Sequence, residues 1–336
     1  MTEHGFRRPA GCLLALALAL AAGCGPTAYR IEPIPADRSL EESTLIDEGG
    51  WSPAKLVLID VSGVIMNGHR FSLLGEGENP VSLFVEKLDK AAGDPSVRGV
   101  LLRINSPGGS VTASDVMYRE LLHFRQRTGG KRPVVAVMMD VAASGGYYLA
   151  CAADEIIAHP TSVTGSIGVI MLQVSLAGTL EKIGVSTDAI KSGPMKDAGS
   201  PFRRMSGEER ALFQHLIDEY YERFVEVVKA GRPRLDEAAI RKLADGRVYS
   251  GRQALEHGLV DRVGTLRDGL AAVKQRIGAR AVRVVTYHRP LDYRPNIYAR
   301  TPADPPQVNL NLLNLNLPEI LPGPEPQFLY LWSPGR

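Results

Sequence analysis

A serine followed by two glycines, Ser144-Gly145-Gly146, is the group of residues in this sequence best suited to chemistry. The stretch before it, PVVAVMM at 133–139, is apolar and predicts a buried strand, and the small and aromatic residues after it can begin a helix. A serine between a strand and a helix lies where unpaired backbone N–H groups favour developing negative charge. This arrangement would suit a nucleophile, although Ser-Gly-Gly is also common in ordinary loops.

A nucleophilic serine needs a general base. None of the seven histidines lies in a recognisable triad motif, and each can be a surface or half-buried residue. The alternative is Lys196, in the glycine- and proline-marked stretch 190–201. A lysine acts as a base only where desolvation or nearby positive charge favours its neutral form. Met195 and Pro194 could supply apolar surroundings, whereas Lys196 and Asp197 could equally be an exposed pair in a loop.

The elements that must position these residues alternate between strand and helix. Apolar, β-rich runs predict strands at 56–65 and 97–105. Helical periodicity predicts helices at 80–92 and 113–124, and a glycine turn, SPGGS at 106–110, precedes the second helix. This order is typical of an α/β protein with a parallel sheet.

The second half of the chain continues with shorter elements. Strands are predicted at 155–159, 166–172 and 186–192. A capping box, Ser206 with Glu209, begins a long helix whose apolar positions form one broad face. The remaining predictions are a short helix from the Ser250–Gln253 capping box with Gly258 as its C-cap, a helix at 266–277 and a strand at 282–288.

The N-terminal residues have the layout of an export signal. Two arginines precede an unbroken Leu/Ala run at 13–22, which is too short to cross a bilayer comfortably as a mature helix. The sequence at 20–24, LAAGC, resembles a bacterial lipobox, with Ala21 where leucine is more usual. The resemblance implies cleavage before Cys24, a lipid on its thiol, and a membrane-anchored protein facing the periplasm or the cell exterior. A plain signal peptide or a short uncleaved anchor is the alternative.

Composition narrows the classes of function. The chain has 336 residues and is 44% hydrophobic, enough for one large or two small domains. Lys+Arg 39 against Asp+Glu 37 is nearly balanced and no basic stripe stands out, so nucleic acid is not an expected partner. Metal-binding spacings such as H-E-x-x-H and C-x-x-C are absent from the sequence. If Cys12 leaves with the signal and Cys24 carries lipid, Cys151 alone remains, so no intrachain disulfide is expected.

Five stretches, in order along the chain, carry the motifs of one known family. They are RINSPGGSV (103–111), AASGGYYLACAADEIIA (142–158), TGSIGVI (164–170), IKSGPMKD (190–197) and DGRVYSGRQALEHGLVD (245–261). Together they resemble the short, single-copy form of the signal peptide peptidase A family of bacterial serine proteases. The resemblance covers roughly residues 55–275. It implies the fold of the Clp protease and the crotonases, a spiral of strand–strand–helix units, with a helical C-terminal part.

The resemblance also implies a role for each matching residue. Ser144 matches the nucleophile, Lys196 the general base, and Ser166, in TGSIG, a serine that orients the lysine. Gly109 and Gly145 match the backbone N–H donors of the oxyanion hole, where only glycine lets the backbone approach a tetrahedral intermediate closely. The implied chemistry is a Ser/Lys dyad with a covalent acyl-enzyme and no metal or other cofactor.

Family members occur as long chains with two tandem halves and as short chains with one copy. In the long chains the lysine and the serine lie in different halves. This chain has one copy and carries both residues. The resemblance therefore implies a homo-oligomer in which Ser144 pairs with Lys196 of a neighbouring subunit, and in which the two side chains of one subunit do not hydrogen-bond.

We therefore expect four segments: a lipoprotein-type signal peptide at 1–23, a flexible tether at 24–53, a protease domain at 54–288 and a proline-rich extended tail at 289–336. The expected function is an endopeptidase that cuts signal-peptide remnants or other unfolded peptides near the membrane. Two alternatives remain. A crotonase-like acyl-CoA enzyme shares the glycine-turn oxyanion hole, although export argues against it because CoA is cytoplasmic. A non-catalytic scaffold could keep the same fold.

Overall fold

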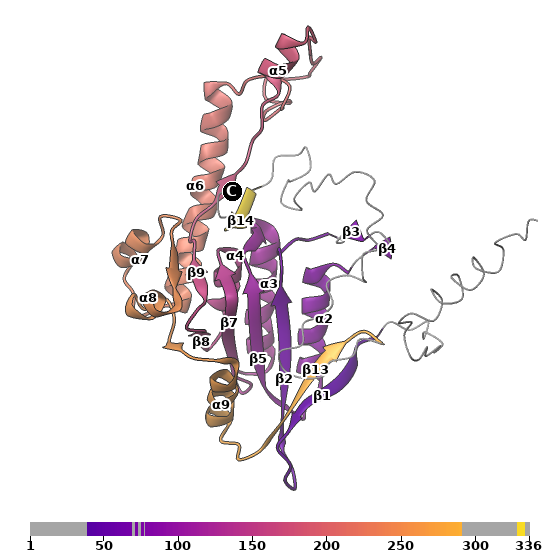
Figure 1. Ribbon diagram of the computed structural model, residues 1–336, viewed down its shortest axis with the longest axis vertical. Helices are drawn as coiled ribbons and strands as arrows, with labels where there is room; N and C mark the ends of the chain where they lie inside the picture. Colours follow the sequence, from indigo (N-terminus) through magenta and orange to yellow (C-terminus); the bar gives the residue numbers. More distant parts are fainter. Residues whose placement is uncertain (1–38, 69–70, 73–74, 77, 291–327, 333–336) are drawn as a thin grey trace, which may run out of the picture. The chain divides into compact units, whose positions relative to one another are not determined.

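The computed structural model describes residues 39–68, 71–72, 75–76, 78–290 and 328–332. The helices and strands of these ranges belong to the unit Leu40–Arg336 (Figure 1). The predicted signal peptide, Cys24 and residues 291–327 of the predicted tail lie outside the described residues. None of the helices in the described ranges is long and apolar enough to span a bilayer.

The central element is a nine-stranded sheet whose main path runs in the order β1-β13-β2-β5-β7-β8-β12. Strands β9 and β11 pair beside that path, β9 against the end of β7. The bounds are β1 Glu41–Asp47, β2 Ala54–Ser62, β5 Val97–Ser106, β7 Val134–Ala143, β8 Glu155–Ala158, β9 Val163–Gly165, β11 Val248–Ser250, β12 Arg262–Val263 and β13 Val282–His288.

Two smaller sheets and eight helices complete the described elements. The small sheets are β10-β14-β6 and β3-β4. Their strands are β3 Phe71–Ser72, β4 Gly75–Glu76, β6 Gly108–Ser110, β10 Ile170–Met171 and β14 Phe328–Leu331. The helices are α2 Pro80–Gly93, α3 Val111–Arg127, α4 Gly145–Ala150, α5 Ala177–Lys182, α6 Gly207–Gly231, α7 Glu237–Leu243, α8 Gly251–Glu256 and α9 Leu266–Ile277.

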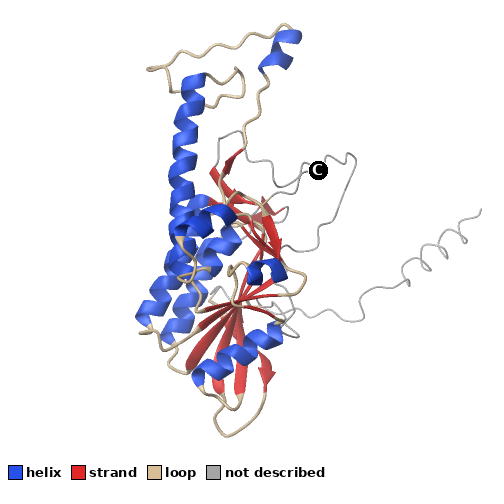
Figure 2. Cartoon of the chain, turned by 90° about the vertical axis from the view of Figure 1, so that its left-hand side faces the viewer, coloured by secondary structure: helices blue, strands red, loops and turns tan. Residues whose placement is uncertain are grey.

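The core of the sheet is parallel and is covered on both faces. Strands β2, β5, β7 and β8 pair in parallel, and Figure 2 shows helices on either side of them. Successive side chains of a strand point to opposite faces. Accordingly, Val100, Leu102 and Ile104 of β5 join the larger core with α2, α3 and α4. Leu101 joins a second core beneath α9. The predicted α/β fold with a parallel sheet is confirmed.

The edge of the sheet differs from the prediction. Residues 41–47, which we expected in the flexible tether, form β1 and pair antiparallel with β13. The sequence of β1, EESTLID, is mostly polar because an edge strand buries few of its side chains. Only Leu45 and Ile46 pack against a core. The folded part of the chain therefore begins before residue 54.

Two other strand predictions also need correction. Residues 186–192 form no strand and lie in a loop. Of the predicted strand at 166–172, only β10 is a strand, because Ser166 adopts a φ of 50° that ends the extended run after β9. Both capping boxes predicted for α6 and α8 are present.

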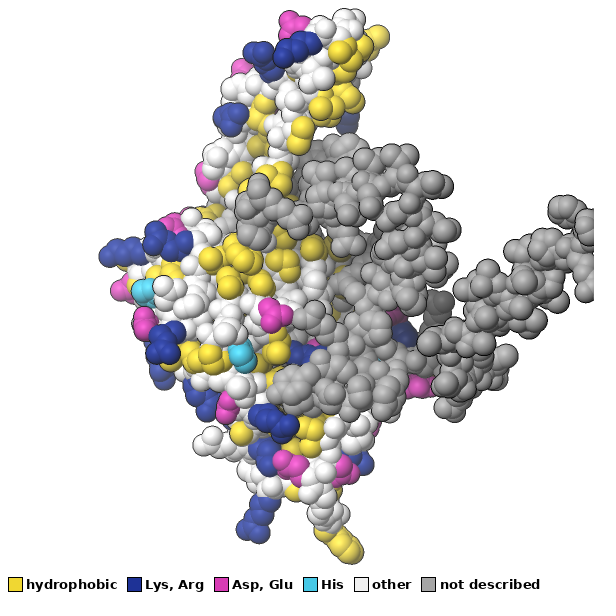
Figure 3. Space-filling model, in the orientation of Figure 1, with side chains coloured by type: hydrophobic (Ala, Val, Ile, Leu, Met, Phe, Trp, Pro, Cys, Tyr) yellow, Lys and Arg dark blue, Asp and Glu magenta, His cyan; other side chains and the backbone are white. Residues whose placement is uncertain are grey.

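Helix α6 extends beyond the body of the sheet together with α5 (Figure 1). Its buried apolar residues lie in its C-terminal half, Phe224, Val225, Val227 and Val228. The predicted apolar face thus packs against this chain only over its second half. Figure 3 shows hydrophobic side chains on the surface of the extension. We call residues 172–206 together with the first half of α6 the arm.

Candidate active site

Ser144 lies where β7 ends and α4 begins, as predicted. It is 1% exposed, and its φ of 51° is in the left-handed region that residues other than glycine rarely adopt. The backbone is held in this turn because the Ser144 N–H donates to the Gly165 carbonyl at 2.8 Å and its own carbonyl accepts from the Tyr148 N–H at 2.8 Å. The Ser144 Oγ has no hydrogen-bond partner among the described residues. A buried hydroxyl without a partner is unusual. The Ser144 Oγ can therefore still form a hydrogen bond with a group from outside this chain.

The glycine turn of β6 packs against Gly145, the residue that follows this serine. On one side of β6, the Ile65 N–H donates to the Gly108 carbonyl and the Ser110 N–H donates to the Ile65 carbonyl, both at 2.8 Å. Because neighbouring residues of a strand direct their polar groups to opposite sides, the Gly109 N–H and carbonyl face away from Ile65. A Cβ added at Gly108 would lie 2.6 Å from the Gly145 nitrogen, so the turn packs tightly against the first residue of α4.

Strand β14 pairs with the edge of β6 that is turned away from Ile65. The strands are antiparallel with Tyr330 opposite Gly109, and the Trp332 N–H donates to the Pro107 carbonyl at 2.8 Å. Since hydrogen-bonded pairs alternate along an antiparallel ladder, Tyr330 and Gly109 form the next bonded pair. A Cβ added at Gly145 would lie 3.2 Å from the Tyr330 carbonyl oxygen. That carbonyl therefore lies close to both residues that are predicted to supply the oxyanion donors.

Ser166 is also close to Ser144. It directly follows Gly165, whose carbonyl accepts the Ser144 N–H, and its own N–H donates to the Arg247 carbonyl at 2.7 Å. Its side chain is 7% exposed and lines an open cavity of about 570 Å³. The cavity lies between the β9–β10 segment, α6 and the end of β14, and Tyr221 and Trp332 form part of its wall.

Lys196 is in a different environment. It lies exposed in the loop of the arm, and within the part of the chain that the structure describes no hydrogen bond joins it to Ser144. Its backbone N–H donates to the Gly193 carbonyl at 3.2 Å. The structure thus brings together Ser144, Gly109, Gly145 and Ser166, but it does not bring Lys196 of the same chain to them.

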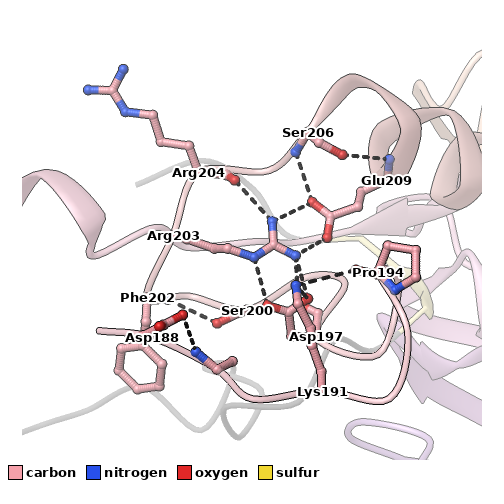
Figure 4. Close-up of polar contacts among 11 residues, drawn as sticks. Asp188, Lys191, Pro194, Asp197, Ser200, Phe202, Arg203, Arg204, Ser206 and Glu209 are labelled. Atoms are coloured by element: carbon pink, nitrogen blue, oxygen red, sulfur yellow. Dashed lines mark hydrogen bonds and ion pairs between the residues drawn. The ribbon is translucent and has the colours of Figure 1, made fainter. Parts of the chain in front are cut away.

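An ion-pair network shapes the loop that carries Lys196 (Figure 4). The Asp197 carboxylate accepts from Arg203 Nε and Nη2, both at 2.8 Å, and from Lys191 Nζ at 2.5 Å. Arg203 and Lys191 hold the pKa of Asp197 well below its usual range. Both oxygens of Asp197 are thus engaged by cations.

The same network joins the loop to α6. Arg203 Nη1 donates to Glu209 Oε2 at 2.9 Å, and Glu209 also accepts from the Ser206 N–H at 2.8 Å in the capping box. The Glu209 side chain is 2% exposed, and its bonds to Arg203 and then Ser206 lower its pKa to about 2. The capping box is evident from the sequence, but the role of Arg203 is not, because nothing in the spacing shows that its guanidinium reaches both carboxylates.

The contribution of β14 to the site was not predicted from the sequence. The apolar run FLYLW at 328–332, after a proline-rich stretch, was the available signal. It indicated an extended segment but not the surface on which that segment docks.

Comparison with known proteins identifies the family. Residues 126–280 match the model of Peptidase family S49. A protein of Enterococcus faecium whose name describes it as a signal peptide peptidase SppA is 38% identical over 248 residues, which is 74% of this chain and 70% of that protein. The chain belongs to peptidase family S49.

Other relatives of this S49 peptidase are named as proteases. A Synechocystis protein is 41% identical over 214 residues, covering 64% of this chain and 71% of that protein. A Methanocaldococcus jannaschii protein is 40% identical over 204 residues, covering 61% and 64% respectively. This S49 chain is a serine peptidase of the signal peptide peptidase A family, and peptides are its substrates. The comparisons therefore favour the peptidase over an acyl-CoA enzyme.

Proposed function

We propose that this S49 peptidase is an endopeptidase that cleaves peptides through a dyad of Ser144 and Lys196, each pair being completed between two subunits. The observation that carries the proposal is the position of Ser144. Its buried hydroxyl has no hydrogen-bond partner among the described residues, and it lies beside the glycine turn of β6 and the first N–H of α4. These are the parts that acyl transfer needs, apart from a base.

The reaction follows from these positions. The Ser144 Oγ attacks the carbonyl carbon of the scissile peptide bond while Lys196 Nζ of the neighbouring subunit accepts the hydroxyl proton. The N–H groups of Gly109 and Gly145 stabilise the oxyanion, and each such donor contributes about 3 kcal/mol in comparable sites. The carbon–nitrogen bond breaks as the lysine returns the proton to the leaving amine. A water molecule, deprotonated by the same lysine, then hydrolyses the Ser144 ester.

Two features support a lysine from a second copy. The arm exposes apolar side chains that nothing in the described chain covers, among them Val174 at 62%, Ile183 at 67% and Phe202 at 51%. Such a surface is typical of a protein–protein contact. In addition, Ser166 faces an open cavity that a lysine from outside the chain can enter, and the Ser166 hydroxyl would there accept from its Nζ. We therefore propose a homo-oligomer in which the arm of one copy docks at the site of the next.

The N-terminal residues support a proposal for the location and the substrates of the enzyme. We propose a lipoprotein anchored through Cys24 and facing the periplasm or the cell exterior, because the sequence at 20–24 is similar to a lipobox. An enzyme held there meets unfolded, apolar peptides such as signal-peptide remnants. The name of the Enterococcus faecium relative points to the same substrate class.

Peptide hydrolysis by the wild type, Ser144→Ala and Lys196→Ala tests the chemistry. Both variants are expected to lose at least about a thousandfold in kcat/KM. Lys182→Ala is the matched control, because Lys182 is another exposed lysine of the arm, and it should retain wild-type activity. A serine-reactive phosphonate should label wild type and not Ser144→Ala. Full activity in both dyad variants would refute the assignment, and the absence of labelling would favour the non-catalytic scaffold.

Membrane fractionation tests the anchor separately. Wild type should partition with membranes, and Cys24→Ser should be released to the soluble fraction if its signal is processed or remain as an unprocessed precursor of higher mass. A Cys24→Ser protein with wild-type mass and partitioning would contradict the lipid anchor.

A further inference from the structure

The edge of the central sheet farthest from Ser144 carries a fully exposed tryptophan. We call it the starting edge, because the parallel strands β2, β5, β7 and β13 all begin there. The loop 48–53 joins β1 to β2 at this edge, at the end of the molecule opposite the arm (Figure 1). Trp51 in this loop is 105% exposed. A single exposed apolar side chain is ordinary on a protein surface, so its surroundings decide what it means.

Three cations without partners lie at the same edge. Arg98 is the second residue of β5, Lys131 comes three residues before β7, and Arg280 comes two residues before β13. All three are exposed, and no hydrogen bond or ion pair joins their side chains to any other residue that the structure describes. Arg280 is next to Ala281, whose Cβ would lie 3.7 Å from a Cβ added at Gly50, so it is close to the loop of Trp51.

The acidic residues of the starting edge are nearly all neutralised. Glu48 pairs with Lys274 and Asp94 pairs with Lys55, each at 2.7 Å. The two acidic residues at the start of β8 are bound by arginines. Among the described acids of this edge, Asp47 alone has no cation and accepts only from the backbone of its own loop. The edge is therefore positively charged around one indole ring, and Figure 3 shows basic and hydrophobic side chains projecting there.

An anionic membrane surface fits this combination better than a protein partner does. The indole ring of tryptophan suits the headgroup level of a bilayer, and nearby Lys and Arg side chains are attracted to anionic lipids. The core of a protein interface is instead apolar and poor in lysine. In addition, β1 leads from the proposed tether directly to the loop of Trp51. A lipid at Cys24 would hold this edge at a high effective concentration near the bilayer, where even a weak contact is populated.

We propose that the starting edge, through Trp51, Arg98, Lys131 and Arg280, contacts an anionic membrane surface. The inference rests on the proposed lipid anchor and not on the proposed dyad. It sets the orientation of the enzyme, because Ser144 follows the opposite end of β7, a strand of ten residues. Ser144 is thereby held roughly 30 Å above the headgroups. A membrane-derived peptide must leave the bilayer surface before it is cleaved.

Quenching by brominated lipids locates Trp51. The full-length protein with Trp332→Phe keeps Trp51 as its remaining tryptophan. It is reconstituted into vesicles of brominated phosphatidylcholine, with or without phosphatidylglycerol. We expect blue-shifted and strongly quenched emission with phosphatidylglycerol, and several-fold weaker quenching without it or at high salt. Emission that is unquenched in every vesicle would overturn the proposal, and blue-shifted but unquenched emission would show that protein covers the loop instead.

Charge variants test the cations. Replacing Arg98, Lys131 and Arg280 together by glutamine should weaken the contact about a hundredfold, so that quenching falls to the value in phosphatidylcholine alone. The matched control makes the same change of charge at three exposed cations in or beside α7 and α8, which also have no side-chain partner among the described residues, and it should leave quenching unchanged. An equal loss in both triple variants would show a general effect of net charge and would overturn the proposed surface. The control positions are Arg234, Lys242 and Arg252.

The quenching measurement is independent of catalysis. Ser144→Ala in the same background should give the same quenching, so an inactive dyad does not affect the result. Mass spectrometry of the N-terminal peptide reports the lipid on Cys24 separately. Quenching of Trp51 in an unlipidated protein would overturn the anchor alone. A lipidated protein whose Trp51 is not quenched would overturn this inference alone.

Discussion

Arg203 binds both carboxylate oxygens of Asp197, through Nε and Nη2 at 2.8 Å each. Asp197 directly follows Lys196, the proposed base. A free carboxylate next to a lysine would favour the protonated lysine, which cannot accept a proton. Arg203 instead engages that carboxylate, and through Glu209 it also fixes the loop to the start of α6 (Figure 4).

Arg203→Ala should therefore lower activity and change its pH dependence. Asp197 loses its main partner and can turn to Lys196, and the loop that positions the lysine loosens. We expect kcat to fall about tenfold or more and the rising limb of the pH–rate profile to move to higher pH. Arg204→Ala, at the exposed neighbouring arginine, is the control. Adding Asp197→Asn to Arg203→Ala should move the limb back, and identical profiles in all variants would contradict this role.

Glu209 predicts a pH-dependent contribution to stability. Its folded pKa of about 2 is lower than the value of about 4.3 typical of an unfolded chain. A carboxylate with a lowered pKa stabilises the fold above the unfolded pKa, and this contribution disappears as the pH falls toward the folded pKa. The thermal midpoint of wild type should exceed that of Glu209→Gln at neutral pH, and the gap should close between roughly pH 4 and pH 2. A gap that stays constant over this range would show that Glu209 is not held as a charged group.

Gly109→Ala should damage both the fold and the site. A Cβ at this position would lie 1.9 Å from the Ile65 carbonyl oxygen, a backbone atom that cannot move aside cheaply. We expect about 1–3 kcal/mol of lost stability and a loss of about a hundredfold or more in kcat as the N–H donor shifts. Gly93→Ala is the control, because a Cβ there meets nothing within 4 Å. Wild-type kcat in Gly109→Ala would contradict the oxyanion role.

Tyr330→Ala should open the site. In the structure β14 lies against β6 and Ser144 is buried, so a peptide or a serine-reactive probe must displace the tail. Without the aromatic ring the tail should leave more readily, and labelling of Ser144 by a phosphonate should accelerate several-fold. The result contrary to this account is slower or unchanged labelling together with a large fall in the thermal midpoint, which would mean that β14 is part of the core.

The sequence predicted the strands and helices that bury an apolar face. The β5 and β7 runs and the 3.6-residue period of α2 and α3 carry that information locally, and so does the strand–serine–helix pattern around Ser144. The polar strand β1 was missed because an edge strand buries little, and 186–192 was wrongly predicted because its few apolar residues are exposed in the arm.

Long-range docking is what the sequence could not predict. The place of β14 on β6 depends on backbone hydrogen bonds, which any extended segment can make. The choice of surface depends on where the Tyr330 side chain can be buried. The reach of Arg203 to Asp197 and Glu209 likewise depends on a loop without periodicity. In the proposed dyad, the position of Lys196 relative to a serine depends on how two chains assemble, and the sequence of one chain does not give that assembly.

Mixing two inactive variants tests the central claim, a dyad shared between subunits, most directly. Ser144→Ala keeps the lysine and Lys196→Ala keeps the serine, so each is inactive alone. When they are dissociated and reassembled together, about a quarter of the sites should combine an intact serine with an intact lysine of the next subunit in a symmetric oligomer. The account predicts recovery of about that fraction of wild-type peptide hydrolysis. No recovery in oligomers that mass spectrometry shows to be mixed would contradict it.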